Sequence, residues 1–180
     1  MMPAEKRPIS PGVSTQTMRS VLGAFATGVV VVTTYGENGE PVGITANSFS
    51  SVSLEPPLVS WCLRLNSYSL PAFRHSRRFA INILGTGGTD LCRRFASAHA
   101  HKWRDLEHFK GEHECPLLTQ SIATLECTLV AEHEAGDHLI IVGRVEKAET
   151  DHTAFPLVVY RGDFYDLGRE QPKARQKQEG

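Results

Sequence analysis

Apolar residues recur at helical spacing near the start of the chain and at strand spacing through most of the remaining sequence. Met18, Val21, Leu22 and Phe25 stand at i, i+3, i+4 and i+7, which places them on one face of a helix. The four valines at 29–32 come directly after a glycine and are too uniformly apolar for a strand with a solvent face. The pattern predicts an amphipathic helix that ends near the glycine, followed by a buried strand.

Further apolar runs, separated by turn residues, predict a series of strands. The Asn-Gly pair within 37–40 favours a hairpin turn, because both residues accept positive φ angles readily. The second strand of this hairpin is expected over 42–49, and a double proline at 56–57 interrupts the pattern before the next strand. Other strands are expected at 58–63, 79–84, 122–132, 138–148 and 157–160, with 164–167 extending the last, and short helices at 68–75 and 91–95. The polar, histidine-rich stretch 97–114 is expected to be a surface excursion. This element order predicts a mainly β protein, an antiparallel barrel with a few peripheral α-helices.

The length of 180 residues fits one domain. We expect a flexible N-terminal segment over 1–14, the domain over 15–168 and a charged C-terminal tail over 169–180.

Charge and cysteine content exclude several classes of function. The formal net charge is −1, so the basic stripe expected of a nucleic-acid-binding protein is lacking. The uncharged stretch 20–36 is interrupted by glycine and is shorter than the about 20 residues that a membrane-spanning helix needs. The cysteines at 62, 92, 115 and 127 form no Cys-x-x-Cys pair and are expected to be reduced thiols. These features predict a cytoplasmic protein that binds neither nucleic acid nor membrane.

A hydroxyl-rich segment at 45–53 stands out from the predicted strands. Six of its nine side chains can form hydrogen bonds, and neither alternation phase is fully apolar. A bound anion or polar heterocycle would use such groups. A serine-rich exposed edge or turn explains the same composition, and composition alone leaves both interpretations open.

Two other motifs give weaker indications of a functional site. The histidines at 99, 101, 108 and 113, with Cys115, fit no zinc spacing, so no metal site is predicted. The glycine-rich turn at 85–88 lacks the full Gly-x-Gly-x-x-Gly pattern of a dinucleotide-binding fold.

Three blocks of sequence together resemble one known family. They are Phe-Ala-Thr-Gly-Val at 25–29, Gly-Ile-Thr-Ala-Asn-Ser-Phe at 43–49, and Ser-Val-Ser-Leu-Glu-Pro-Pro-Leu-Val at 51–59. They resemble the flavin reductase-like family, whose short-chain members supply reduced flavin to two-component monooxygenases, and later motifs extend the likeness over about residues 17–167. The resemblance implies a Greek-key split β-barrel of the FMN-binding type, usually a homodimer with flavin near the subunit interface.

The resemblance assigns a flavin, FMN or FAD, to this region of the chain. Its ribityl and phosphate groups would lie against Thr45, Ala46, Asn47, Ser48, Ser51, Val52 and Ser53. Its ring would lie beside Cys62 and Leu63, with Asn66 and Ser67 in the following turn. We interpret the Cys62 side chain as a small packing residue in preference to a reactive thiol.

The resemblance also assigns His138, after Gly-Asp at 136–137, to the docking of NADH or NADPH. We expect it to be the catalytic candidate, acting by orientation or electrostatics, because hydride transfer between two cofactors needs no protein nucleophile. Without the resemblance, a histidine at the start of a strand is usually a surface or capping residue.

Two basic residues are candidate phosphate contacts. Lys102 is retained from the family pattern and is either a phosphate contact or a solvated lysine. Arg161 either neutralises a phosphate or forms a structural salt bridge. The chain departs from the family pattern at His101 and Trp103, where aspartate and phenylalanine are usual, and at Gly88, where glutamine is usual.

The predicted function is an NAD(P)H:flavin oxidoreductase of the EC 1.5.1 type, serving a partner monooxygenase through diffusible reduced flavin. Two alternatives stay open: a flavin-binding protein that does not reduce flavin, and an oxidoreductase of the same barrel that retains FMN. The sequence does not choose between NADH and NADPH, or between FMN and FAD.

Overall fold

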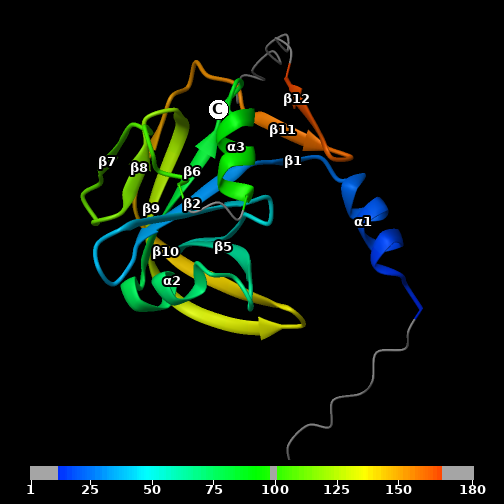
Figure 1. Cartoon of the computed structure of the whole chain (residues 1–180), viewed down its shortest axis with the longest axis horizontal. Coiled ribbons are helices and arrows are strands. Elements are labelled where there is room, and N and C mark those ends of the chain that lie inside the picture. The colour runs from blue at the N-terminus through cyan, green and yellow to red at the C-terminus, as the bar shows by residue number, and fades with distance from the viewer. Residues whose placement is uncertain (1–11, 98–100, 168–180) are drawn as a thin grey trace, which may run out of the picture.

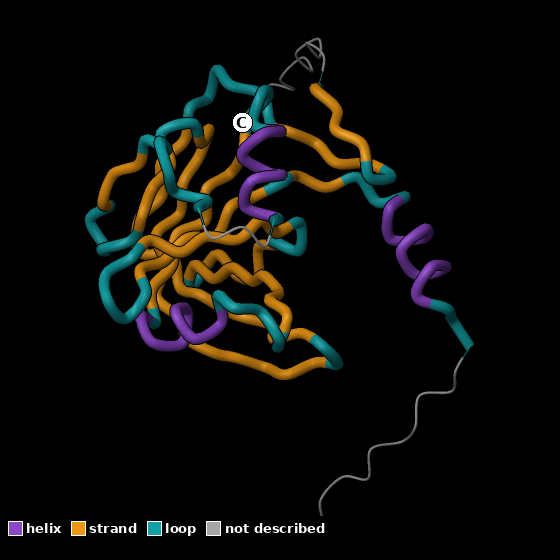
Figure 2. Tube along the Cα trace, in the orientation of Figure 1, coloured by secondary structure: helices purple, strands orange, loops and turns teal. Residues whose placement is uncertain are grey.

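The computed structural model describes residues 12–97 and 101–167 (Figures 1 and 2). Residues 1–11 of the predicted N-terminal segment and the whole predicted tail at 169–180 lie outside the described residues. The described helices are α1 (Thr15–Gly23), α2 (Leu70–Ser76) and α3 (Thr89–Ala96). The described strands are β1 (Thr27–Gly28), β2 (Val30–Tyr35), β3 (Pro41–Ala46), β4 (Ser50–Leu54), β5 (Pro57–Arg64), β6 (Arg78–Leu84), β7 (His108–Lys110), β8 (Pro116–Leu118), β9 (Ser121–Ala135), β10 (His138–Thr150), β11 (Leu157–Tyr160) and β12 (Asp163–Asp166). The expectation of a mainly β fold with few helices is confirmed.

Seven strands form one antiparallel sheet in the order β3-β2-β6-β9-β10-β5-β4. Residues of β2 pair with β3 on one side and β6 on the other, so that Val31 faces both Thr45 and Asn82. The long β9–β10 hairpin turns at Gly136, whose φ of 64° suits a residue without a side chain. The sheet curls around its core (Figure 1), but its edge strands β3 and β4 share no hydrogen-bonded ladder, so the barrel is open.

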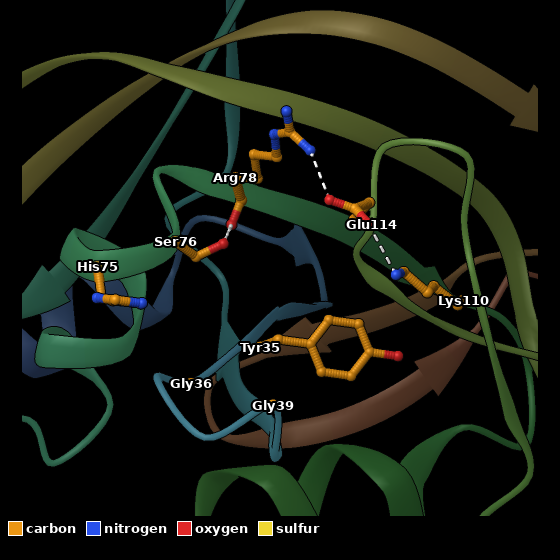
Figure 3. Close-up of a pocket in the computed structure, with 8 residues that line it drawn as sticks. All are labelled: Tyr35, Gly36, Gly39, His75, Ser76, Arg78, Lys110 and Glu114. Carbon is orange, nitrogen blue, oxygen red and sulfur yellow. Dashed lines mark hydrogen bonds and ion pairs between the residues drawn. The ribbon is translucent and has the colours of Figure 1, made fainter.

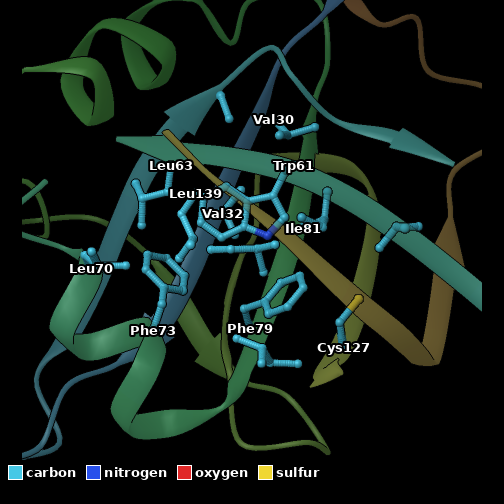
Figure 4. Close-up of a cluster of buried hydrophobic side chains, with 14 residues drawn as sticks. Val30, Val32, Trp61, Leu63, Leu70, Phe73, Phe79, Ile81, Cys127 and Leu139 are labelled. Carbon is cyan, nitrogen blue, oxygen red and sulfur yellow. The ribbon is translucent and has the colours of Figure 1, made fainter. Parts of the chain in front are cut away.

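Large apolar side chains fill the inside of the curled sheet, as Figure 4 shows. Trp61 is fully buried and meets Phe73 of α2 and Phe79 of β6 edge to face, with ring centroids 5.0 and 5.8 Å apart. Val32, on the strand predicted to lack a solvent face, is also fully buried. Along β5 and β10 burial alternates, and every second residue points into this interior.

A second apolar cluster lies between the sheet and α3, with Val31, Leu84 and Phe95 at its centre. A buried amide crosses the sheet nearby. The Asn82 side chain donates to the Val31 carbonyl and accepts from the Leu118 backbone N–H at 2.8 Å. Because these buried polar groups satisfy one another, β8 can cover this side of the sheet without unpaired donors.

A small sheet of β1, β11 and β12 leads to α1, which projects from the body (Figure 1). The helix begins at Ser14, whose Oγ accepts from the Thr17 backbone N–H at 3.1 Å. The predicted helix is confirmed, but it ends at Gly23 and not near Gly28, so that Phe25 lies beyond it. Its apolar face does not pack on the protein's own core. Val21, Leu22 and Phe25 are 65%, 60% and 76% exposed.

Three predicted segments differ from the structure. The strand expected over 42–49 ends at Ala46, and 50–54 forms a separate strand paired with β5. The stretch 97–114 is not merely a surface excursion, because the Trp103 ring packs on Phe95 with centroids 5.1 Å apart and 108–110 pairs with β8. Residues 163–166 form the partner strand of β11 and do not extend it. No helix within the described ranges has the length and apolar content to cross a bilayer.

Candidate functional site

The hydroxyl-rich segment 45–53 spans the end of β3, a connecting loop at 47–49 and most of β4. Its first two residues turn inward. The Thr45 hydroxyl donates to the Cys92 carbonyl of α3 at 2.7 Å, and Ala46 is buried. Thr45 therefore fixes α3 against β3, Ala46 packs into the barrel interior, and both side chains are already occupied by contacts within the chain.

The rest of the segment is largely open to solvent. Asn47, Ser51 and Val52 are exposed and Ser53 is half-buried. The register between β4 and β5 shifts between Ser51 and Ser53, which leaves Val52 without a cross-strand partner. Short polar side chains and a bulged backbone are therefore presented outward at this sheet edge.

Ser48 ties this loop to the neighbouring strand. Its Oγ accepts from the Cys62 backbone N–H at 2.9 Å. In β5, the residues on either side of Cys62, Trp61 and Leu63, are fully buried, so Cys62 points away from the core. The Leu63 side chain lies inside the barrel, which leaves only its backbone for a ligand on the outer side.

β10 brings His138 to the same side. Ile140 pairs with Cys62 and His138 pairs with Arg64, while Leu139 and Ile141 between and beyond them are buried in the core. We call the side of β5 and β10 that carries Ser48, Cys62, His138 and Ile140 the outer face. Residues that are up to 90 positions apart in sequence (138 − 48) therefore meet on one surface.

The turn after β5 is fastened beside His138. The Leu65 backbone N–H donates to the Asp137 carbonyl at 3.0 Å. Asn66 follows and is exposed, and the Ser67 hydroxyl accepts from the Ser69 backbone N–H at 3.3 Å. Both predicted turn residues thus lie at the end of the outer face where His138 begins β10.

His138 is held by its sequence neighbour. Its Nδ1 lies 2.7 Å from Asp137 Oδ1, and its side chain is 37% exposed. The hydrogen bond and the charge of His138 lower the pKa of the Asp137 carboxyl, and Arg64 adds to this effect. The contact orients the imidazole and directs Nε2 away from Asp137. Sequence reasoning missed Asp137 and Arg64, although the Gly-Asp-His order already placed the carboxylate next to the imidazole.

Lys102 takes a structural position. Its ammonium donates to the Phe95 carbonyl at 3.0 Å and lies 3.5 Å from the Gly43 carbonyl. Burial lowers the pKa of this amine. Half-buried Lys102 thus links the end of α3 to β3, a contact that neither of the two alternatives included.

The departure at Gly88 has a steric reason. Gly88 is the N-cap residue of α3, and a Cβ at this position would lie 2.9 Å from the Gly85 carbonyl oxygen. Any side chain, including the glutamine usual in the family pattern, would require this turn to shift.

Arg161 lies apart from the outer face, in the turn between β11 and β12. Its backbone N–H donates to the Gly23 carbonyl at 2.8 Å, and its guanidinium lies 5.3 Å from the centre of the Tyr160 ring. Within the described residues it forms no ion pair, so the alternative of a structural salt bridge finds no support there.

A hollow of about 680 Å³ lies elsewhere, beside the β2–β3 turn (Figure 3). Glu114 bridges Arg78 at 3.0 Å and Lys110 at 2.8 Å there. None of the predicted site residues lines it, and its charges already satisfy one another. In the part of the chain that the structure describes, no three potential ligand side chains gather as a metal site would require.

Comparison with known proteins decides the family. A family model described as "Flavin reductase like domain" matches residues 22–168. The chain belongs to this family. The match includes the outer face and begins within α1.

Relatives within the flavin reductase-like family are similar along nearly the whole chain. The chain is 36% identical over 165 residues to the reductase subunit HsaB of a flavin-dependent monooxygenase from Mycobacterium tuberculosis, covering 91% of this chain and 88% of that protein. It is 41% identical over 169 residues to the FMN reductase (NADH) SmoA of Agrobacterium fabrum, covering 94% and 95%. A solved structure of the NADH:FAD oxidoreductase SgcE6 of Streptomyces globisporus, in complex with NAD and FAD fragments, is 35% identical with a TM-score of 0.80, covering 88% and 94%. The expected family and its split-barrel fold are confirmed.

Proposed function

We propose that the chain is an NAD(P)H-dependent flavin reductase, which transfers a hydride from NADH or NADPH to FMN or FAD. The observation that carries this proposal is the outer face itself. An exposed polar loop, the half-buried Cys62 and the oriented imidazole of His138 share one side of two paired strands. Relatives named as flavin reductases, and a monooxygenase reductase subunit among them, support the same function.

The residues of the outer face fit a flavin. An isoalloxazine ring needs an apolar surface with a few polar anchors, and the half-buried side chains of Cys62 and Ile140 offer that surface. Asn47, Ser51 and Ser53 carry amide and hydroxyl groups suited to the ribityl and phosphate groups. Thr45, Ala46 and Leu63 contribute through the backbone in this proposal, because their side chains are occupied inside the chain.

When both cofactors are bound, the nicotinamide supplies the hydride and the flavin accepts it. The task of the protein is therefore to hold two rings at a set distance and angle and to exclude water. In our proposal His138 contacts the nicotinamide dinucleotide, with Asp137 keeping the imidazole oriented. Asn66 and Ser67, in the adjoining turn, border the same site.

We propose that the site is completed by a second copy of the chain in a homodimer. The polar loop and the outer face are open in one chain, and Met18, Val21 and Leu22 of α1, with Phe25 just beyond its end, are exposed to solvent. None of these apolar side chains is buried by the chain's own core. In this proposal, the second copy that buries them also covers the outer face and forms the other side of the site for the flavin and nicotinamide rings.

The partner in this proposal is a flavin-dependent monooxygenase that takes up the reduced flavin. We place the enzyme in the cytoplasm, because all four cysteines are free thiols and that compartment keeps thiols reduced.

Turnover of free flavin tests the function. Purified protein is mixed with NADH or NADPH and with FMN or FAD, and oxidation of the nicotinamide is followed against unfolded protein. We expect oxidation well above that background with at least one pairing. Background rates with all four pairings would contradict the proposal and favour a flavin-binding protein. Flavin that stays bound through gel filtration while added flavin turns over poorly would favour an FMN-retaining enzyme.

A further inference from the structure

A second concave site lies away from the outer face, where α1 meets the β11–β12 turn. Arg19, Ser20 and Gly23 of α1 and Arg161 and Gly162 of the turn line a pocket of about 440 Å³. Figure 1 shows α1 leaving the body beside this hairpin. We call it the arginine pocket.

The helix is turned in an unusual way at this pocket. Surface helices normally bury their apolar face and expose their polar face. In α1, Arg19, Ser20 and Gly23 face the chain's own hairpin, and the apolar side faces out. Residues 19 and 23 are one turn apart, so both lie on the side of the helix that meets the hairpin. The contact between α1 and the rest of the chain is thus a polar one.

The pocket carries two positive charges and no lining carboxylate. Both arginine side chains border it, and all the other lining residues are serine or glycine. Among residues 12–97 and 101–167, neither Arg19 nor Arg161 forms an ion pair, although other arginines of the chain do. The Arg161 guanidinium lies over the Tyr160 ring, and an anion in the hollow would offset the repulsion between the two positive charges that border it.

The backbone at Arg161 supports a role for its side chain. Arg161 has a φ of 52° and Gly162 a φ of 88°, the pair of left-handed residues that a two-residue hairpin turn requires. Asparagine or glycine adopts this conformation at the first position with less strain than arginine, which costs on the order of 1 kcal/mol there. The Arg161 backbone N–H also donates to the Gly23 carbonyl, so the strained residue is fixed against α1.

We propose that the arginine pocket binds phosphate groups of a nucleotide cofactor, with Arg19 and Arg161 as the two contacts. The planar guanidinium presents paired N–H donors that match phosphate oxygens, and Ser20 adds a hydroxyl. Gly23 and Gly162 leave room for an anion to approach the backbone; a Cβ at Gly162 would meet nothing within 4 Å.

The path of the chain connects this pocket to the outer face. Val30, at the start of β2, pairs with Ala46 and stands seven positions after Gly23 (30 − 23). Seven residues span at most about 25 Å, which is the upper limit of the distance from Gly23 to the start of β2. The link to the cofactors rests on the proposed function, whereas anion binding by the pocket does not.

Inorganic diphosphate tests the pocket without any turnover. We expect diphosphate to raise the Tm of the wild-type protein beyond the effect of sodium chloride at equal ionic strength. Arg19→Gln and Arg161→Gln should each abolish most of that rise. Arg104→Gln, which removes an exposed arginine of the 101–107 loop, is the matched control and should respond like wild type. An equal response in all four proteins, or none in wild type, would overturn the proposal.

The cofactors then identify the source of the phosphate. Binding of FMN, FAD, NADH and NADPH is measured by titration, so that the result does not depend on catalysis. If the Kd for NADPH alone rises about tenfold in both arginine variants, the arginine pocket binds the 2′-phosphate. If the Kd rises for FAD but not for FMN, the pocket binds the diphosphate of FAD. If the Kd rises equally for NADH and NADPH, the pocket binds the diphosphate of the nicotinamide dinucleotide. If it rises equally for FMN and FAD, the pocket binds the phosphate on the ribityl chain. Unchanged binding of all four would refute the assignment to a cofactor, even if the protein reduces flavin.

Discussion

The barrel interior and the outer face are two sides of the same strands, and they differ in what completes them. Along β10, Leu139 and Ile141 are 1% and 0% exposed inside the barrel, whereas His138 and Ile140 are half-buried on the other side. The interior is closed by residues of this chain alone. The outer face has one wall and, in our proposal, is completed by cofactors and a second copy. A strand can therefore fix the fold and present a site at once, because successive side chains point in opposite directions.

The largest expected effect contrasts the barrel interior with the exposed apolar residues at and just after α1, through the same substitution at one phenylalanine in each region. Phe79→Ala removes a ring that is 1% exposed and packs on Trp61. We expect it to lower the free energy of unfolding by about 3–5 kcal/mol, through lost burial and the cavity left behind. Denaturant unfolding followed by tryptophan fluorescence measures the change.

Phe25→Ala is the matched variant, because Phe25 is 76% exposed in the single chain. Its effect should be within about 0.5 kcal/mol at low protein concentration, as for most surface substitutions. At higher concentration it should weaken self-association, which sedimentation velocity measures. A loss as large as that of Phe79→Ala at every concentration would show that the two regions do not differ as described.

An intermediate effect is expected at the site itself. His138→Ala should raise the KM for the nicotinamide cofactor or slow hydride transfer by about tenfold, equivalent to about 1.4 kcal/mol, with the Kd for flavin nearly unchanged. Steady-state kinetics and a flavin titration give the two values. His152→Ala, an exposed histidine beyond the end of β10, is the control and should leave both unchanged. An equal loss of flavin binding in His138→Ala would mean that this imidazole serves the flavin or the fold.

The smallest effect concerns the thiols and leaves stability unchanged. Burial raises the pKa of Cys115 and of Cys127 to about 12, so neither forms thiolate near neutral pH, and both should resist a thiol reagent until the protein unfolds. Cys62 is half-buried and faces outward, so it should react first in the native protein.

Added FMN should slow that first reaction if the flavin lies over Cys62. Cys62→Ser should remove the fast phase without changing the others. Two or more fast-reacting thiols in the wild type would contradict the burial of Cys92, Cys115 and Cys127.

The interior could be predicted well from the sequence, since its signal is local. The uniform apolar run at 29–32 indicates a strand without a solvent face, and the alternation along 138–148 indicates which residues face inward. The glycine turn at 135–137 marks where the long hairpin reverses. Hydrophobic burial depends on few details beyond this pattern, which explains why the mainly β fold and the positions of most strands along the chain followed from it.

The outer face was predicted less completely, because its groups act through tertiary contacts. The sequence places Thr45 and Lys102 among polar candidates, but only the fold shows that they bond to carbonyls of α3. Cys62 and Leu63 are adjacent in the sequence, and the packing of the barrel decides which one faces out. Periodicity identified the apolar side of α1, yet it contains no information on what covers that side.

Because α1 contributes no buried residue to the chain's own core, folding of the barrel places almost no constraint on the residue types at the apolar positions of α1. Random substitution at Val21 or Leu22 should be tolerated by any selection for a folded barrel and rejected by a selection for activity. At Val31, which is fully buried, both selections should reject the same changes. The helix would thus evolve separately from the barrel. The residue types accepted at its apolar positions would depend on the surface that covers them and not on the packing of the barrel.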